Sequence, residues 1–548
     1  MKLSKRLGLW AIAVAVIGVL FYLPMVRVLA QGLVGGWQTT LAEPRVVDAI
    51  WFTIWQATLS TLICLVMGLP AAYVLYRRRS PGARVLRALL TVPFALPTIV
   101  TAIGFTVFRT QDVWHGGTAA EGLFDNPVTW IIAAHIFVNF SVITRVVGST
   151  WVSQSPDIEE AAALSGAGRL RIFWSISLPQ LRPALVSAAF TVFLYCTASY
   201  GLILVLGGGL VNSIETEIAI AANQFLDLQE AGTLALFQTL LSVAVFAIST
   251  TGSRSKIGFD VQDIDDGKKA IDRRDLPVVV ITWVSILLTL APLALIMHRA
   301  FTDEAGMLTL NYFAALGTNG ARDLLDITLG QAALNSLRNV VVATLLAGVI
   351  GTLVAYLLSR PAKTRGLRLA NRMLDIVFLL PLGVSTIVLG FGYLITFGSG
   401  WFPLRSSWLV VPLVQGLMAL PLVVRIVLPA LQASSDELGE QAATDGASNL
   451  SAFLRVELPM AREAVSAAFG YAAIVSIGEF GAASLLAYGD QATLPTVLYQ
   501  LVSRPGGDNY GMAMAMSAIV IALTYAVVFA ASLPAKHRTR PRHLRAAT

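Results

Sequence analysis

Long apolar stretches alternate with short polar segments along nearly the whole chain. An apolar run of about twenty residues is long enough to cross the hydrocarbon core of a membrane as a helix. The pattern predicts twelve such spans, near residues 8–30, 50–76, 88–109, 129–151, 184–206, 232–251, 277–298, 332–358, 373–397, 407–430, 463–487 and 511–533. We therefore expect an all-α polytopic membrane protein with about 12 transmembrane helices.

The two groups of six spans carry the same polar loop. Residues 160–179 read EAAALSGAGRLRIFWSISLP, and residues 440–459 read EQAATDGASNLSAFLRVELP. A shift of 280 positions superimposes them without a gap, pairing Glu160 with Glu440, Ala162 with Ala442, Gly166 with Gly446, and Leu178-Pro179 with Leu458-Pro459. Each half has six spans in the same orientation, which predicts two six-helix units in a parallel repeat around a pseudo-twofold axis along the membrane normal.

Each loop has the signals of two short helices. Ser155-Pro156-Asp157 and Ser434-Ser435-Asp436-Glu437 provide a capping hydroxyl followed by acidic residues, which favours a helix start. The following glycine suits a left-handed helix end, and the Leu-Pro pair is expected to stop the second short helix. We predict a helix, a turn and a second helix outside the membrane at 155–179 and 434–459. A simple connector would have no reason to recur at matched positions.

The repeat also predicts domain boundaries. The first unit covers 1–252, a charged linker 253–276, the second unit 277–534, and a basic tail 535–548. Residues 253–275 mix six basic with six acidic residues and lack an apolar run, so we expect a solvated cytoplasmic linker. A metal-binding loop at Asp263, Asp265 and Asp266 is the alternative, which the balancing lysines and arginines disfavour.

Composition and charge narrow the class of protein. The chain is 56% hydrophobic and 13% charged, which excludes a soluble protein. The net charge of +7 lies in short loops between spans, where membrane orientation explains it better than nucleic-acid binding. The basic loops predict that both termini and both repeated loops are cytoplasmic. The first span also suits a signal peptide, but its length favours a retained helix.

The pattern Glu-Ala-Ala, three residues, Gly and then Leu-Pro resembles the signature loop of permease subunits of bacterial ATP-binding-cassette importers. Gln441 departs from it at the first alanine of the second copy. The resemblance implies that each loop is a coupling helix that docks on an ATPase subunit. It assigns this contact to Glu160, Ala161, Ala162, Gly166, Leu178, Pro179, Glu440, Ala442, Gly446, Leu458 and Pro459.

The resemblance also implies partners and a location. The expected partners are two copies of the ATPase, an extracytoplasmic solute-binding protein and membrane lipid, with no nucleic acid. The expected location is the bacterial cytoplasmic (inner) membrane. The chain itself lacks a GxxxxGK[ST] loop, HExxH and CxxC, so we expect no cofactor, metal or catalytic residue of its own and ATP hydrolysis by a separate subunit.

Glu479 is the only acid in the middle of a predicted span, and Ser199 occupies the matching position of the first unit. A charge at this depth is costly unless it faces protein, water or a solute. Both residues are therefore candidates for the translocation path. The alternative is that Glu479 only holds helices together.

Short segments narrow the solute. WFTIWQATLS, LYRRRSPG, AHIFVNF, VLGGG with IETEIAIA, and ATLPTVLYQLVSR resemble fused permeases for thiamine or its phosphates, and next those for ferric iron. A secondary transporter driven by an ion gradient also uses paired repeats, but it does not need twin cytoplasmic loops. A membrane enzyme would need a cluster of catalytic residues, which the sequence does not contain.

Overall fold

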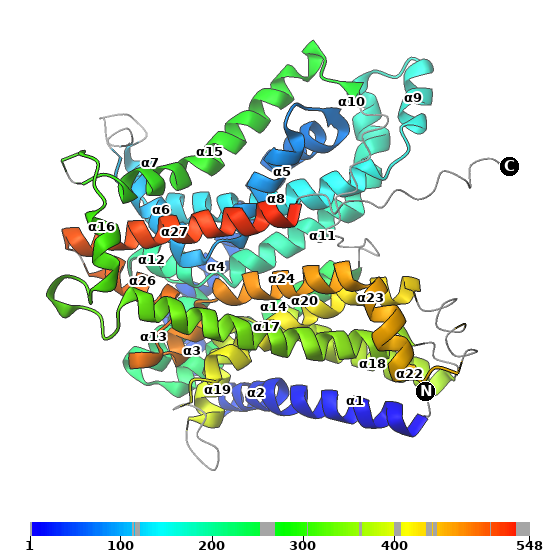
Figure 1. Ribbon diagram of the computed structural model, residues 1–548. Helices are drawn as coiled ribbons and strands as arrows, with labels where there is room; N and C mark the ends of the chain where they lie inside the picture. The colour runs from blue at the N-terminus through cyan, green and yellow to red at the C-terminus, as the bar shows by residue number, and fades with distance from the viewer. Residues whose placement is uncertain are drawn as a thin grey trace.

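The computed structural model describes residues 3–34, 36–111, 114, 121–251, 269–303, 305–360, 364–398, 407–434, 441, 446–504 and 506–532. Within these residues most of the chain is helical, and the long helices share one general direction (Figure 1). Nine helices are long and apolar enough to cross a membrane, or up to 12 if each of three bent pairs counts as one span. This confirms the predicted all-α polytopic fold.

The first half of the chain begins with a helix that crosses the molecule and continues with short and long helices in alternation. Its elements are α1 (Leu3–Ile17), α2 (Leu23–Leu33), α3 (Trp37–Ala42), α4 (Pro44–Ala72), β1 (Arg78–Arg79), α5 (Ala83–Ala95), α6 (Thr98–Arg109), α7 (Glu121–Asp125), α8 (Pro127–Val152), α9 (Asp157–Leu164), α10 (Arg169–Ile172), α11 (Leu178–Thr197), α12 (Gly201–Gly207), α13 (Ile214–Ile220) and α14 (Leu228–Thr251). Turns of π-helix connect several of them, at η1 (Gly18–Tyr22), η2 (Tyr73–Arg77), η4 (Phe173–Ser177) and η5 (Ala221–Phe225).

The second half repeats this order. Its elements are β2 (Lys269–Ala270), η6 (Arg273–Asp275), α15 (Leu276–Ala300), α16 (Asn311–Ala314), η7 (Ala315–Gly317), η8 (Ala321–Asp323), α17 (Leu329–Ser359), α18 (Arg365–Leu379), η9 (Leu380–Gly383), α19 (Thr386–Phe397), α20 (Val410–Ser434), α22 (Asn449–Ala452), η11 (Phe453–Glu457), α23 (Leu458–Met460), α24 (Arg462–Ile477), α25 (Gly481–Leu486), η12 (Gly489–Gln491), α26 (Leu494–Ser503) and α27 (Gly507–Ser532). The strands β1 and β2 pair in parallel, with Arg78 opposite Lys269.

Two predicted spans, 88–109 and 373–397, are each broken and sharply bent. The chain turns by 101° between α5 and α6, and by 100° between the helix that ends at Gly383 and α19. Pro97 keeps Leu96 out of the helical conformation in the first unit, and Ser385 caps the new helix in the second by accepting from the Ile387 amide. No charged residue falls within 88–108 or 376–397, so the pattern predicted each segment as a continuous span.

Two further predicted spans, 184–206 and 463–487, also contain a break. Helix α11 ends at Thr197 and α12 begins at Gly201, while α24 ends at Ile477 and α25 begins at Gly481. The two gaps fall at equivalent positions of the repeat. The residues of interest for the translocation path, Ser199 and Glu479, lie inside these gaps.

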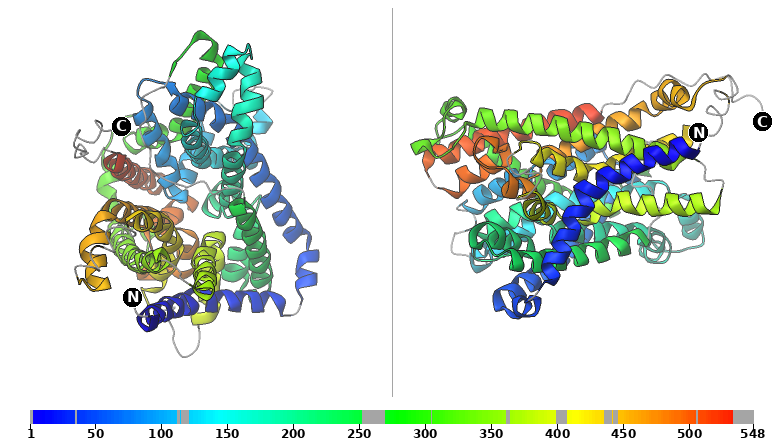
Figure 2. Two further views of the ribbon diagram at one scale, coloured as in Figure 1. Left: turned by 90° about the vertical axis from the view of Figure 1, so that its right-hand side faces the viewer. Right: turned by 90° about the horizontal axis from the view of Figure 1, so that it is seen from below.

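The first helix of each half packs on the other half. Helix α2 contacts α19, and α1 contacts α17, while α15 packs against α4 and α6. In Figure 2 the blue N-terminal helix accordingly runs beside the yellow-green helices of the second unit. The buried apolar core is continuous across the two units. The halves are therefore interlocked rather than two bundles set side by side.

The repeat extends to single hydrogen bonds. Ser213 and Thr216 form a capping box at the start of α13, and Thr493 and Thr496 form the same box at the start of α26. The next amide of each helix donates to a hydroxyl on a long span, Ile214 N to Thr53 Oγ1 at 3.0 Å and Leu494 N to Ser336 Oγ at 2.8 Å. This conserved local geometry supports the alignment that the sequence predicted.

Candidate coupling loops and translocation path

The first predicted coupling helix is α9, which begins at Asp157. The N-cap residue is Pro156, and the hydroxyl before it, Ser155 Oγ, accepts from the Asp157 amide at 3.3 Å. Three acidic residues lie in the first turn, where they favour the positive end of the helix. Glu160 and Ala161 are exposed, and Ala162 is half-buried. This surface is available to a partner.

Both glycines of the repeated loops have the left-handed conformation that the sequence predicted. The φ angle is +84° at Gly166 and +81° at Gly446. The amide of Ala167 donates to the Ala162 carbonyl at 3.0 Å, which closes the end of α9. A β-carbon on either glycine would meet no other atom within 4 Å. The glycines are therefore required by the backbone angle and not by crowding.

The Leu-Pro pairs do not end the second short helix, contrary to expectation. Helix α10 continues through η4 into α11, and Leu178 N donates to the Phe173 carbonyl. A π-helical turn leaves room for the Pro179 ring and its missing N–H. In the second unit the same turn, η11, precedes Leu458, and the bend of 77° comes only after Met460. Leu178 and Leu458 are half-buried, and Pro179 and Pro459 are exposed.

Equivalent arginines hold the two loops against the spans. Arg77 Nη2 lies 2.8 Å from Glu159 Oε2, and Ser177 Oγ donates to Glu159 Oε1 at 2.8 Å. Arg360, the counterpart of Arg77, pairs with Glu457, which replaces Ser177 in the repeat. Partial burial raises the pKa of Glu159, but the hydrogen bonds from Arg77 and Ser177 outweigh it and hold that pKa below its usual value. The carboxylate is charged at neutral pH.

Both loops expose large apolar side chains at matching positions. Leu170 is 75% exposed and Trp174 64%, and their counterparts Leu450 and Leu454 are 66% and 51% exposed. Two equivalent apolar patches on polar loops are unusual for surfaces that face only water. The two loops therefore carry equivalent exposed apolar patches.

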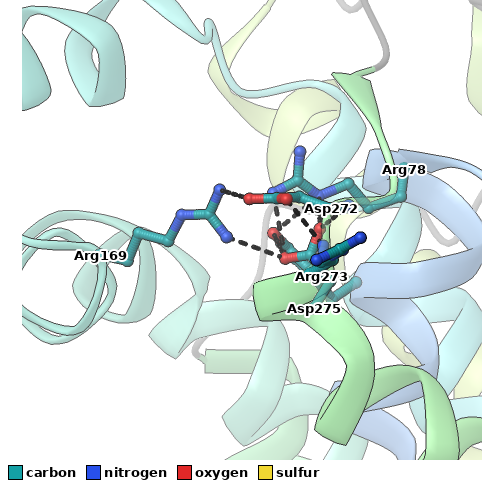
Figure 3. Close-up of polar contacts among 6 residues, drawn as sticks. Arg78, Arg169, Asp272, Arg273 and Asp275 are labelled. Carbon is teal, nitrogen blue, oxygen red and sulfur yellow. Dashed lines mark hydrogen bonds and ion pairs between the residues drawn. The ribbon is translucent and has the colours of Figure 1, made fainter.

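The end of the linker is tied to the first loop by a cluster that we call the linker clamp, formed by Tyr73, Arg78, Arg169, Asp272 and Asp275 (Figure 3). Arg169 Nη2 lies 3.1 Å from Asp272 Oδ2, and Arg169 Nη1 lies 3.2 Å from Asp275 Oδ1. Arg78 Nε lies 3.3 Å from Asp275 Oδ2. The Asp275 side chain is buried, whereas residues 270–274 before it are exposed, as expected for a solvated linker.

Some predicted residues lie outside the described part of the chain. These are Glu440 and Ala442 of the second coupling loop, the linker residues Asp263, Asp265 and Asp266, and the tail 535–548. The described remainder of the second loop, from Gly446 onward, matches the first loop.

Glu479 lies in the gap before α25 and is buried. Its Oε1 accepts from the Ala482 amide at 2.7 Å, and its Oε2 accepts from the Ala483 amide at 3.3 Å. The carboxylate therefore accepts hydrogen bonds from the first free amides of α25. A negative group is favoured at this end of a helix. Ser199 is also buried, in the equivalent gap before α12.

The aromatic residues that follow Ser199 and Glu479 meet each other. Tyr200 and Phe480 are equivalent in the repeat, and their rings stack at 5.3 Å with an interplanar angle of 19°. Two equivalent residues in contact must lie on the pseudo-twofold axis. Tyr200 is 8% and Phe480 2% exposed, so the stack is buried where the two units meet.

Buried acids near the end opposite the coupling loops were not predicted. Glu215 and Glu217 lie on α13 and are buried, although they fall between the predicted spans 184–206 and 232–251. Ser385 of the second unit donates to Glu215 Oε2 at 2.6 Å, and Arg45 Nη1 lies 3.1 Å from Glu217. The capping signal at Ser213 predicts the helix, but nothing in the sequence indicates its burial.

Comparisons with known proteins agree with this geometry. Residues 64–257 and 348–536 each match the family described as binding-protein-dependent transport system inner membrane component. The chain is 27% identical over 489 residues to a thiamine transport system permease protein of Brucella abortus, covering 86% of this chain and 85% of the relative. A protein of the same description from Salmonella typhimurium is 26% identical over 521 residues, covering 92% of each chain. A sulfate transport system permease protein of Escherichia coli is 28% identical over 237 residues, covering 42% of this chain and 85% of the relative.

Proposed function

The chain belongs to the family of binding-protein-dependent transport system inner membrane components, and from that premise we propose that it carries thiamine or its phosphates across the inner membrane. It is a fused two-unit permease of an ATP-binding-cassette importer, a multi-pass protein and not an enzyme. The observation that carries the solute assignment is the collinear match to thiamine permeases over both units. The sulfate relative matches only 42% of the chain.

The exposed apolar patches support docking of one ATPase subunit on each coupling loop. Leu170 with Trp174, and Leu450 with Leu454, would be removed from water in such a complex. We therefore assign to Glu160, Gly166, Gly446 and their neighbouring loop residues the contact with the ATPase. Under this proposal the loops and both termini lie in the cytoplasm, and an extracytoplasmic solute-binding protein docks at the opposite end.

The symmetry of the two units supports a path along the pseudo-twofold axis. Tyr200 and Phe480 would close it in the present conformation, with Ser199 and Glu479 beside them. The domain limits 1–252 and 277–534 remain our working division. The interlocked first helices mean that neither unit is expected to work alone.

Uptake of radiolabelled thiamine tests the solute assignment. The chain is expressed with its ATPase and binding protein in a strain that lacks thiamine uptake, and ATP-dependent accumulation is the expected result. Accumulation of ferric iron without thiamine would overturn the solute assignment and favour the alternative that short segments of the sequence suggested. An uptake driven by an ion gradient without ATP would contradict the whole proposal.

A further inference from the structure

We propose that a cavity in the second unit, near the end of the molecule opposite the coupling loops, is a binding site for the transported solute. The ligand class is a small aromatic cation that carries hydrogen-bond donors, of which thiamine is one. The inference rests on the proposed function for the identity of the solute. The inference adds a location to the proposed function, because the site is lined by residues of the second unit alone.

The cavity has a volume of about 210 Å³ and lies between three segments of the second unit. Its wall combines the middle of α17, the start of α20 and the connection from α25 to α26. The polar and aromatic residues that line it are Asn339, Ser407, Trp408, Tyr488, Asp490 and Gln491. A few polar groups among aromatic and aliphatic side chains are typical of a small-molecule site.

Asn339 provides the observation that points to a ligand. The residue is 1% exposed, and its Oδ1 has no hydrogen-bond partner among the described residues. A buried carbonyl oxygen without a donor is destabilising, because it has lost its hydrogen bonds to water. An N–H group of a molecule in the cavity would remove this cost.

The rim of the cavity suits an aromatic cation. Trp408 is 36% and Tyr488 47% exposed, and aromatic faces attract cations. The Asp490 carboxylate adds a negative charge. Among the described residues, the positive charge beside the cavity is Arg338, which does not line it: its guanidinium lies 4.3 Å from the centre of the Trp408 ring, and its Nη2 donates to Gln491 Oε1 at 2.9 Å. Arg338 thereby holds two wall residues in place.

The first unit serves as an internal comparison, because the repeat gives each lining residue a counterpart there. Val128, Gly208, Leu210 and Val211 replace Trp408, Tyr488, Asp490 and Gln491, and Gln56 replaces Asn339. The longer Gln56 side chain reaches across to donate to the Cys196 carbonyl at 3.1 Å. The first unit thus lacks the rings, the carboxylate and the shorter amide. Gln56 Oε1, like Asn339 Oδ1, has no hydrogen-bond partner among the described residues, so the two units differ here in the rings, the carboxylate and the length of the amide side chain.

Cysteine protection tests the site directly in the assembled importer in nanodiscs. Ser407→Cys adds a thiol of nearly the same size to the wall, and the two natural cysteines, Cys64 and Cys196, are buried. We expect saturating thiamine to slow labelling by a polar maleimide about tenfold. Leu210→Cys in the first unit, which starts from a residue 79% exposed, is the matched control and should be labelled equally with and without thiamine.

Uptake kinetics provide the second measurement. Asn339→Gln and Trp408→Val copy elements of the first unit, and each should raise the KM for thiamine uptake about tenfold with little change in maximal rate, the effect of losing one good contact. Trp51→Val, at a tryptophan that is 66% exposed on α4, controls for a general effect of losing an indole. Protein level is measured for each variant.

The outcomes separate this inference from the proposed function. Normal thiamine uptake by the wild type, with no protection of Ser407→Cys and an unchanged KM in both wall variants, would overturn the cavity as a solute site and leave the proposed function standing. Failure of the wild type to take up thiamine would overturn the proposed function and this inference with it.

Discussion

At the scale of single residues, the backbone angle of two glycines is the most exacting feature of the coupling loops. Gly166 and Gly446 have φ angles of +84° and +81° in open surroundings. A β-branched residue in the left-handed region costs roughly 1–2 kcal/mol. Such a substitution would therefore change the direction of the loop and leave the packing of the spans intact.

We predict that Gly166→Val or Gly446→Val abolishes uptake while the protein still inserts at its normal level. Gly168→Val is the matched control, because Gly168 also has open surroundings but an ordinary φ of −68°. Uptake is compared at equal amounts of membrane protein. Wild-type uptake by the double variant at 166 and 446 would refute the role of these loops in coupling.

Glu479 presents a second question at this scale. Both of its oxygens accept from amides of α25, so Glu479→Gln removes one charged acceptor. We predict a loss of stability of about 1–3 kcal/mol, seen as a lower amount of folded protein after mild heating. Uptake per folded molecule then decides the path assignment. A normal value would remove Glu479 from the solute path, and a reduced value for thiamine would support it.

Among the elements of the fold, the linker clamp connects a coupling loop of one unit with a spanning helix of the other. Asp275 immediately precedes α15, which packs on α4 and α6 of the first unit, and Arg169 begins α10 of the first coupling loop. The clamp thus joins the first coupling loop to the first helix of the second unit. In the described residues, the second loop has its own arginine, Arg360, but no equivalent of Asp275 beside it.

We predict that Asp275→Ala frees this end of the linker. Arg169 is half exposed and water screens its charge, so we expect the free energy of opening this end of the linker to fall by only about 1.4 kcal/mol. That change corresponds to tenfold faster trypsin cleavage at Lys269. Asp326→Ala, at an exposed acid, is the control. Cleavage at the wild-type rate would mean that the β1–β2 pair alone holds the linker.

The sequence predicted an element correctly where a short local motif determines where the element starts or ends. The capping hydroxyl of Ser155 and the glycine at 166 defined α9, and the repeat placed its partner. The prediction failed at the Pro179 stop, because a π-helical turn accommodates that ring, and at the breaks inside four spans, because apolar residues continue on both sides of each break. Burial of Glu215 and Asp275 was also missed, since it depends on contacts with residues about 170 to 200 positions away.

In the whole molecule, the pseudo-twofold axis relates the two units to each other. The Tyr200–Phe480 stack lies on it, inside the two helix breaks. An aromatic pair of this kind contributes about 0.5–1.5 kcal/mol beyond its buried area. That stabilisation favours the closed centre seen here.

We predict that Phe480→Ala weakens this closure. The assembled importer should then hydrolyse ATP without its binding protein at a rate several-fold above the wild type, because each 1.4 kcal/mol lost shifts the population tenfold. Phe529→Ala, at an exposed ring on α27, is the control. An unchanged basal rate of ATP hydrolysis at normal expression would mean that the stack has no role in the transport cycle.

The central claim is that one chain provides two equivalent docking surfaces, at Leu170 with Trp174 and at Leu450 with Leu454. Native mass spectrometry of the importer, purified through a tag on this chain, measures the consequence directly. The account predicts one copy of this chain with two copies of the ATPase subunit, falling to one copy when Leu170 and Trp174 are both changed to Asp. A wild-type importer that transports with a single ATPase subunit would contradict it.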